Sequence, residues 1–419
     1  MKYIFINRFF FPDQSATAVM ISDLLSGLDT SERECVVITS ASVHTEGDDL
    51  EQRNFENVRT IRIPGLARGN GSLLQRLFNF FLFYLGVIIV GLRTIKRDDA
   101  VICLTDPPLV SVFVQPIARL KRARMINWLQ DIYPETATVL GFGSDTSLVV
   151  RMSRFLRDRS WKLANVNVCI GSRMAQRVAA IGVDEAKIRV IPNWADEDEL
   201  APLPIANNPL RSEWNLSESS VIVGYSGNLG RAHDVDTMLD AGRRLIAMGE
   251  THLQFLFVGG GVKHARLPVV ANEPLIAPHF QVRGYRPRGE LRLSLAVADI
   301  HWLSLEPELE GLIVPSKFYG AIAAGRPIIF IGDTDGEIAR LINAAECGKS
   351  FGKGRVQEVV DYLQLLSNDA GLRRRLGENG RRYCEDNLRR LSRIGEWDDL
   401  LSQVSVKKPD ASLGERPTG

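Results

Sequence analysis

The sequence predicts an α/β protein with two Rossmann-like, doubly wound domains that face a cleft between them. Its 419 residues exceed one ordinary domain of about 100 to 200 residues. A rhythm of short apolar runs alternating with helix-period segments starts at the N-terminus and restarts once, which is typical of parallel sheets covered on both faces. Because ligands bind outside the carboxyl ends of such strands, we expect the function to lie between the domains.

The composition is that of a globular chain able to bury sizeable cores, with 45% hydrophobic and 24% charged residues. Lys and Arg number 51 against 50 Asp and Glu, so no global field marks a nucleic-acid-binding protein. The five scattered cysteines favour a reducing compartment over structural zinc. The first apolar run is too short for a signal peptide. These features predict a cytoplasmic protein.

The first predicted domain covers residues 1–195. A helix near residues 16–28 follows its first strand, and a stretch of acids and prolines around residues 190–204 is the expected hinge. The candidate strands of this domain are short apolar runs followed by polar turns, at residues 3–6, 35–39, 58–63, 101–104, 124–129 and 166–170.

The second predicted domain covers residues 196–387 and repeats the rhythm. Its candidate strands lie at residues 221–225, 254–258, 280–282, 300–303 and 327–331. An amphipathic helix over residues 388–405 is expected to pack back on the first domain. Residues 406–419 are rich in Lys, Pro, Asp, Ser and Gly, which predicts a disordered tail.

The segment from Glu306 to Ile329 is the most informative. It begins with an acidic loop that contains a glycine, continues with a helix that starts after Pro315, and ends in a buried strand. Ser316 is a candidate N-cap, and amides at that helix start are able to bind a phosphate with help from Lys317.

Two glycine-rich loops follow strands of the second predicted domain. Gly227 lies in the first loop, and Gly259 and Gly260 lie in the second. Such patterns also occur in plain turns between a strand and a helix. We favour a close approach of the backbone at the cleft.

Motifs along nearly the whole chain resemble GT-B glycosyltransferases of family 4, in their bacterial surface-polysaccharide branch. The strongest is the donor-binding motif at residues 315–327, PSKFYGAIAAGRP. The other segments, in chain order, are FFPDQSAT at 10–17, WLQDIYPE at 128–135, VIPNW at 190–194, GYSGNLGRAH at 224–233 and FVGGG at 257–261. The order of the motifs makes the resemblance much more specific than any single one.

The resemblance implies which residues form the site. The C-terminal domain holds the nucleotide diphosphate, where Arg231 and Lys317 neutralise the leaving group. Glu310 lies near the transferred sugar, and Asp131 lies in the N-terminal loop that contacts the sugar or the acceptor. Further expected contacts with the nucleotide-sugar are Gly227, Asn228, His233, Gly259, Gly260, Gly311, Leu312, Pro315 and Ser316.

The chain departs from the family pattern at nucleotide-binding positions. Gly320 stands where relatives have a glutamate that grips the ribose, and Asn228 and His233 replace an Arg and Lys pair. These departures leave open a degenerate partner subunit that binds nucleotide or lipid. A second alternative is a nucleotide-sugar 2-epimerase, which can share the two-domain architecture but gains no support from the glycine at position 320. Asp-x-Asp strings at 196–198, 234–236 and 333–335 have a capping or turn explanation, so we expect no metal and no cofactor.

Residues 77–92 form the longest apolar run, which is interrupted by Asn79 and short for a membrane span. One interpretation is a buried helix of the first domain. The other is an aromatic-rich surface, covering residues 62–97, that contacts anionic lipid. The cations that flank the run are Arg62, Arg68, Arg76, Arg93, Lys96 and Arg97.

The sequence and the resemblance together predict a retaining, hexosyltransferase-type enzyme. We expect it to move a sugar from a nucleotide-sugar, preferably a UDP-sugar, to a lipid-linked or glycan acceptor. The expected setting is surface-polysaccharide assembly at the inner face of the cytoplasmic membrane.

Overall fold

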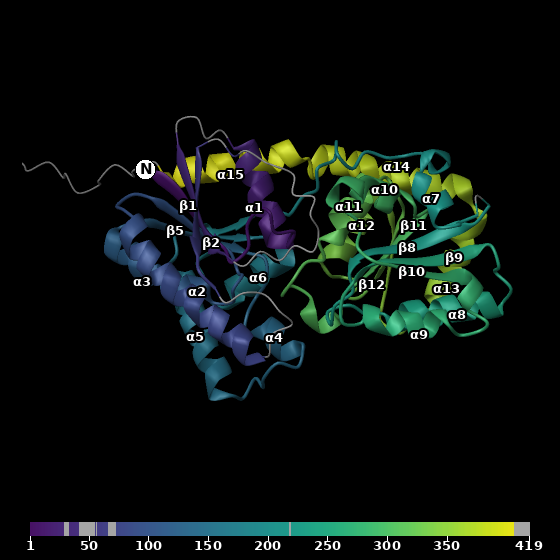
Figure 1. Ribbon diagram of the computed structural model, residues 1–419, viewed down its shortest axis with the longest axis horizontal. Coiled ribbons are helices and arrows are strands. Elements are labelled where there is room, and N and C mark those ends of the chain that lie inside the picture. The colour runs from purple at the N-terminus through teal and green to yellow at the C-terminus, as the bar shows by residue number, and fades with distance from the viewer. Residues whose placement is uncertain (29–32, 42–54, 56, 66–72, 218, 406–419) are drawn as a thin grey trace, which may run out of the picture.

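The computed structural model describes residues 1–28, 33–41, 55, 57–65, 73–217 and 219–405. It has two lobes, each built on a parallel sheet flanked by helices, and the last helices of the chain run along both (Figure 1). The predicted fold class, two doubly wound α/β domains, is confirmed.

The first sheet has seven parallel strands among the described residues. In spatial order they are β3 (Val58–Ile63), β2 (Glu34–Ser40), β1 (Lys2–Ile6), β4 (Ala100–Cys103), β5 (Arg124–Leu129), β6 (Val166–Cys169) and β7 (Ile188–Val190). Its connecting helices are α1 (Ala16–Gly27), α2 (Leu73–Thr94), α3 (Val110–Lys121), α4 (Glu135–Val139), α5 (Leu148–Leu163) and α6 (Ser172–Ala180). Side chains of α2 and α3 share a core on one face of the sheet, and side chains of α1 share a core on the other.

The second sheet has six parallel strands in the part of the chain that the structure describes. They are β10 (Phe280–Arg283), β9 (Leu253–Gly260), β8 (Val221–Asn228), β11 (Ile300–Ser304), β12 (Ile328–Ile331) and β13 (Gly348–Phe351). The helices of this lobe are α7 (Pro209–Glu213), α8 (Asp236–Ala247), α9 (Leu267–Ala271), α10 (Leu291–Ala296), α11 (Lys317–Ala323), α12 (Glu337–Ala345), α13 (Val356–Asn368) and α14 (Ala370–Asn387).

Two edge strands, β7 and β13, are missing from the sequence-based expectation. Their sequences, IRV and GKSF, lack an apolar run because one side of each strand faces solvent. Strands β8 and β9 also extend beyond the expected ends and include the first glycines of both loops. A strand that ends in glycine is hard to delimit from apolar content alone.

The chain ends by returning to the first lobe. Helix α15 (Arg390–Ser405) crosses that lobe, as the yellow ribbon in Figure 1 shows. The Trp397 ring of α15 lies 4.5 Å from that of Trp128 on β5, measured between centroids. Arg390 Nε donates to Asp23 on α1 at 2.8 Å. The tail predicted at residues 406–419 lies outside the described residues.

The exposure of helix α2 decides between the two interpretations of the apolar run at residues 77–92. Over Leu77–Thr94 the helix is long and apolar enough to cross a membrane by length and composition, with a mean hydropathy of 1.8. Only 17% of that window is buried, so the interpretation as a buried core helix is wrong. The chain therefore exposes an apolar helix on its first lobe.

The position of Trp397 predicts a large stability effect. The side chain is fully buried against Trp128, so Trp397→Ala leaves a cavity in the first lobe and is expected to cost about 3–5 kcal/mol of unfolding free energy. Urea denaturation followed by circular dichroism measures this loss. Leu391→Ala, at an exposed position of the same helix, serves as the control and should change stability by less than about 0.5 kcal/mol.

Candidate active site

The two lobes meet through backbone contacts at the carboxyl ends of their strands. The loop of residues 306–316 follows β11 and reaches the first lobe, where the Ile132 N–H donates to the Leu312 carbonyl oxygen at 2.9 Å. Asp131 and Ile313 form an antiparallel bridge beside this bond. The loop that contains Glu310 therefore contacts the first lobe directly beside Asp131.

The two glycine loops pack against each other. Gly227 and Gly259 lie opposite each other at the ends of β8 and β9, both with positive φ. A Cβ at Gly259 would lie 2.2 Å from the Gly227 carbonyl oxygen, and one at Gly227 would lie 2.7 Å from Lys317 Cε. Neither position has room for a side chain. The expected close approach is therefore present, and it joins the two loops and Lys317.

Lys317 and His233 form a buried pair under these loops. His233 Nδ1 donates to the Ser304 carbonyl oxygen at 2.6 Å, which leaves Nε2 as an acceptor for the Lys317 Nζ–H at 3.2 Å. Burial, reinforced by the charge of Lys317, lowers the pKa of His233 to about 3, so the ring stays neutral. Burial lowers the pKa of Lys317 to about 8. An anion beside Lys317 would favour its charged form.

Arg231 extends from the second lobe across the cleft. Its guanidinium lies 5.2 Å from the ring centroid of Phe142 in the first lobe. Arg231 is exposed and forms no ion pair with any residue that the structure describes. Lys263 lies nearby, where its Nζ donates to Glu306 at 2.9 Å and to the His233 carbonyl oxygen. Three cations therefore gather around the glycine loops.

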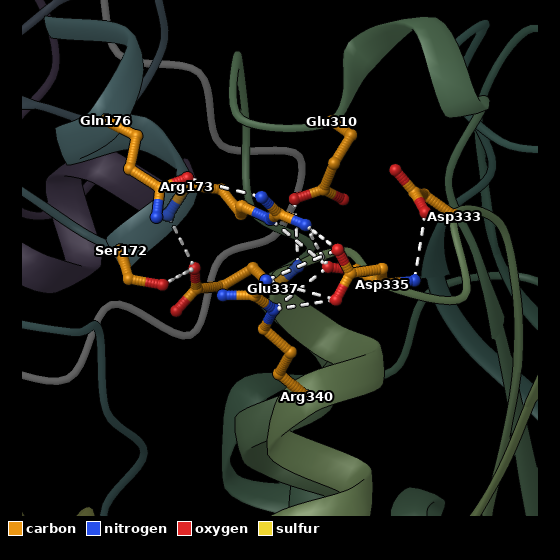
Figure 2. Close-up of polar contacts among 8 residues, drawn as sticks. All are labelled: Ser172, Arg173, Gln176, Glu310, Asp333, Asp335, Glu337 and Arg340. Atoms are coloured by element: carbon orange, nitrogen blue, oxygen red, sulfur yellow. Dashed lines mark hydrogen bonds and ion pairs between the residues drawn. The ribbon is translucent and has the colours of Figure 1, made fainter.

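Two glutamates cap helices that lack caps of their own, and one of these caps, by Glu337, connects the lobes. The N-cap residue of α12, Gly336, has no side chain, and Glu310 Oε1 accepts from the Glu337 N–H at 2.8 Å instead. The N-cap residue of α6 is also a glycine. There Glu337 Oε2 accepts from the Arg173 N–H at 2.9 Å and from Ser172 Oγ at 2.8 Å. Figure 2 shows both glutamates within this network.

Arginines of α6 reinforce the same contact. Arg173 donates through Nε to the Asp335 carbonyl oxygen at 3.1 Å and pairs with the Asp335 carboxylate (Figure 2). Arg177 Nε donates to the Glu310 carbonyl oxygen at 2.8 Å. Burial raises the pKa of Glu310, whose carboxylate is held by the start of α12. The position of Glu310 is thus fixed by the closed arrangement of the lobes.

The first lobe contributes two neighbouring carboxyl groups. Asp131 follows β5 and accepts a hydrogen bond from Thr105 Oγ1 at 3.5 Å. Burial raises the pKa of Asp131 to about 6. Burial also raises the pKa of Asp106, which follows β4, to about 7, and the charge of Asp131 adds to this effect while Arg8 opposes it. Both groups therefore change protonation state near neutral pH.

Comparisons with known proteins find a matching family model and related sequences. Residues 207–383 match the family model "Glycosyl transferases group 1". The "Probable glycosyltransferase WbjE" of Pseudomonas aeruginosa is 27% identical over 304 residues, which cover 71% of this chain and 72% of the relative. These matches, together with the fold, support a GT-B glycosyltransferase whose second lobe matches the group 1 family.

Two further matches, one in sequence and one in structure, cover more of this chain. The "Putative colanic acid biosynthesis glycosyl transferase WcaI" of Escherichia coli K12 is 21% identical and covers 81% of this chain and 86% of its own. The crystal structure of Anabaena HepE in complex with UDP has a TM-score of 0.72 at 13% identity, over 96% of this chain and 100% of that chain. The structural likeness shows that the fold is shared.

The structure places the site residues predicted from the sequence in two main groups, one at the glycine loops and one in the loop that contacts the first lobe. Lys317, Gly227 and Gly259 meet directly, with Gly260 and the exposed Asn228 at the ends of the same strands. Glu310, Gly311, Leu312 and Pro315 line the loop that contacts the first lobe. Ser316 occupies the N-cap position of α11, but its side chain makes no capping hydrogen bond. Ser316 is therefore the N-cap residue by position, as expected, but it does not cap the helix through its side chain.

Three residues that lie at the site were not identified from the sequence, namely Asp106, Lys263 and Glu337. Asp106 follows β4 in the way that Asp131 follows β5, so its place after a buried strand was a usable signal. Lys263 follows the second glycine loop, but it belongs to none of the motifs recognised in the sequence. Glu337 begins a helix, and its contact with α6 depends on how the lobes pack.

The three Asp-x-Asp strings of the glycosyltransferase cap backbone turns. Asp196 Oδ1 accepts from the Glu199 N–H at 2.9 Å, and Asp234 Oδ1 accepts from the Thr237 N–H at 3.2 Å. Asp333 Oδ1 accepts from the Asp335 N–H at 2.9 Å. The described residues include no group of three or more His, Cys, Asp or Glu side chains able to hold a metal ion.

The trans-domain cap predicts that Glu337 holds the cleft closed. Glu337→Ala leaves the first amides of α6 without their acceptor and should weaken closure by about 1–3 kcal/mol. Small-angle X-ray scattering is expected to show a larger radius of gyration with unchanged circular dichroism. Glu358→Ala, at an exposed position on α13, is the control. An unchanged scattering profile for Glu337→Ala would contradict the assignment.

Proposed function

We propose that this glycosyltransferase moves a hexose from a UDP-sugar to a lipid-linked or glycan acceptor with retention of anomeric configuration. The observation that carries the proposal is the meeting of Lys317 with two glycine loops in a cleft closed by the other lobe. The relative named for colanic acid biosynthesis, WcaI, supports a role in surface-polysaccharide assembly, and the UDP complex of HepE supports a UDP-sugar donor. We place the reaction at the cytoplasmic face of the membrane.

The donor side supplies positive charge without a metal. Lys317 is oriented by His233 and packs against Gly227, where a side chain would take the space of the Lys317 stem. A diphosphate bound there receives the Lys317 ammonium, and Arg231 approaches it from the exposed rim. Such preorganised charges stabilise a diphosphate more strongly as it leaves than while it is bound to the sugar. In this proposal the two cations replace a divalent metal, and no cofactor takes part.

The acceptor side supplies Asp131 and Asp106. Their position at the ends of neighbouring strands faces the loop that holds Glu310. We assign Asp131 to orienting the acceptor hydroxyl or the sugar, and Glu310 to the face of the sugar. The departing diphosphate accepts the proton of the acceptor hydroxyl. Closure of the lobes brings these groups to one donor and one acceptor.

Loss of the Lys317 ammonium is expected to reduce turnover by about 100-fold or more, since it removes one preorganised donor at the leaving group. Transfer by purified Lys317→Ala from a UDP-sugar to membrane extracts measures the effect, with thermal unfolding to show that the fold is intact. Lys349→Ala, an exposed lysine on β13 of the same lobe, should retain wild-type turnover. Full turnover by Lys317→Ala would overturn the assigned role.

The pKa of Lys317 predicts how nucleotide affinity changes with pH. Because burial lowers this pKa to about 8, the free protein loses the ammonium as the pH rises through 8. UDP affinity is therefore expected to be constant from pH 7 to about 8 and then to fall by up to about tenfold per pH unit. Isothermal titration calorimetry measures the profile. In Lys317→Ala the decline above pH 8 should be absent, and a decline that persists would assign it to another group.

A further inference from the structure

We propose that helices α2 and α5 together form a surface that docks on an anionic lipid bilayer, and that α5 forms the half nearer the active cleft. The surface extends the expected contact through residues 62–97 to a second helix. Of the cations expected there, Arg62 donates to the Phe11 carbonyl oxygen, while the side chains of Arg68 and Arg76 lie outside the described residues. The inference rests on the proposed function only in that a lipid-linked acceptor explains why such a surface is needed.

Helix α5 carries an outward apolar stripe. Leu148 and Val149 are 75% and 74% exposed, and Phe155 is 61% exposed. Residues at spacings of three and four share one face of a helix. The exposed residues that follow this spacing along α5 are Leu148, Met152, Phe155, Leu156, Arg159 and Leu163.

A charged network on the opposite face keeps this stripe outward. Arg157 is buried, donates to Glu135 Oε2 and to the Tyr133 carbonyl oxygen at 2.7 Å each, and lies over the Trp161 ring at 4.5 Å. Rotating α5 to bury its apolar stripe would bring Arg157 into water and break these bonds. The packing of the lobe thus commits α5 to an exposed apolar face.

Helix α2 presents a matching stripe on the same layer. Its exposed apolar side chains are Leu77, Phe78, Phe81, Leu85, Ile89 and Leu92, and Phe81 is 59% exposed. Helix α3 packs against both α2 and α5, and the three helices lie together on the first lobe (Figure 1). Single exposed apolar residues are ordinary, but two continuous stripes on one layer mark an interaction surface.

The charge on these helices identifies the partner. Helices α2, α3 and α5 carry nine Lys and Arg residues (two, two and five) against one acid, Asp158, which pairs with the buried Arg157. The whole chain is nearly neutral, with 51 cations and 50 acids. Arg151, Arg159 and Lys162 are exposed and form no ion pair among the described residues. Anionic headgroups satisfy these cations while the apolar stripes enter the acyl boundary.

A second copy of the chain fits this surface poorly. A two-fold contact would place the exposed cations Arg151, Arg159 and Lys162, which form no ion pair among the described residues, against their own copies. The long aliphatic stem of Arg159, within the apolar stripe, suits a bilayer interface, because such side chains bury their stems and keep their charge at the headgroups. The surface therefore matches lipid in both its apolar and its charged parts.

The surface also leads to the cleft. Helix α5 follows the loop that carries Phe142, whose ring meets Arg231 of the second lobe, and the short helix α4 connects that loop to the segment with Asp131. Docking through α5 thus brings the cleft close to the headgroups. An acceptor held in the membrane by its lipid reaches Asp131 without leaving the bilayer.

Flotation of the full-length protein with vesicles tests the proposal. The wild type is expected to float with phosphatidylcholine vesicles that contain phosphatidylglycerol, to stay behind with phosphatidylcholine alone, and to detach at high salt. Met152→Glu with Phe155→Glu on α5, and Phe81→Glu with Leu85→Glu on α2, should each abolish flotation. Val269→Glu with Leu275→Glu, which alters exposed apolar residues of the second lobe, is the matched control and should float like the wild type.

The charged part is tested separately by reversing Arg151, Arg159 and Lys162 to Glu, which should weaken binding to anionic vesicles about 100-fold. Reversal of Arg288, Arg375 and Arg382 is the charge-matched control and should have no such effect. Equal flotation by the α5 variants and the wild type would overturn the proposal. So would a wild-type dimer that the α5 variants convert to monomers.

A thermal shift with UDP keeps this test separate from the proposed function. Variants of α5 that lose vesicle binding should keep the UDP-induced shift of the wild type, because the glycine loops lie in the other lobe. A wild type that floats on anionic vesicles without any shift from nucleotides would overturn the assigned reaction and leave the docking surface intact.

Discussion

The loop of residues 306–316 is the constraint on which the site depends. It leaves the second sheet after β11, yet Ile132 of the first lobe donates to the Leu312 carbonyl oxygen, and Arg177 holds the Glu310 carbonyl oxygen. Backbone bonds of this kind fix position more tightly than side-chain pairs. The loop therefore sets the distance between the lobes, and it positions Glu310, which lies within it, and Lys317, which directly follows it.

Helix capping is the means by which closure and the site are coupled. Helices α6 and α12 both begin at a glycine and lack a cap from their own segment. Each takes a carboxylate instead, α12 from Glu310 and α6 from Glu337 across the cleft. Opening the lobes would separate the Arg173 amide at the start of α6 from the Glu337 carboxylate. Glu337 is also the first residue of α12, the helix that Glu310 caps. Glu310 thus responds to the arrangement of both lobes.

The parts of the fold that depend on local pattern were predictable from the sequence. Apolar runs revealed the buried strands, and the motif at residues 315–327 indicated Lys317. Other features depend on tertiary contacts. The edge strands β7 and β13 have no apolar run, and the cap by Glu337 exists only when the lobes meet. Helix α5 departs from the usual pattern of apolar residues inside and charged residues outside, because Arg157 is buried and Phe155 is exposed.

A structure of the protein with a bound UDP-sugar tests the central claim most directly. The account predicts that the diphosphate lies against the glycine loops, with Lys317 Nζ and an amide of the 227–230 loop within about 3.2 Å of its oxygens. The sugar should lie between Glu310 and Asp131. A diphosphate bound elsewhere, with Lys317 still paired only to His233, would contradict the account.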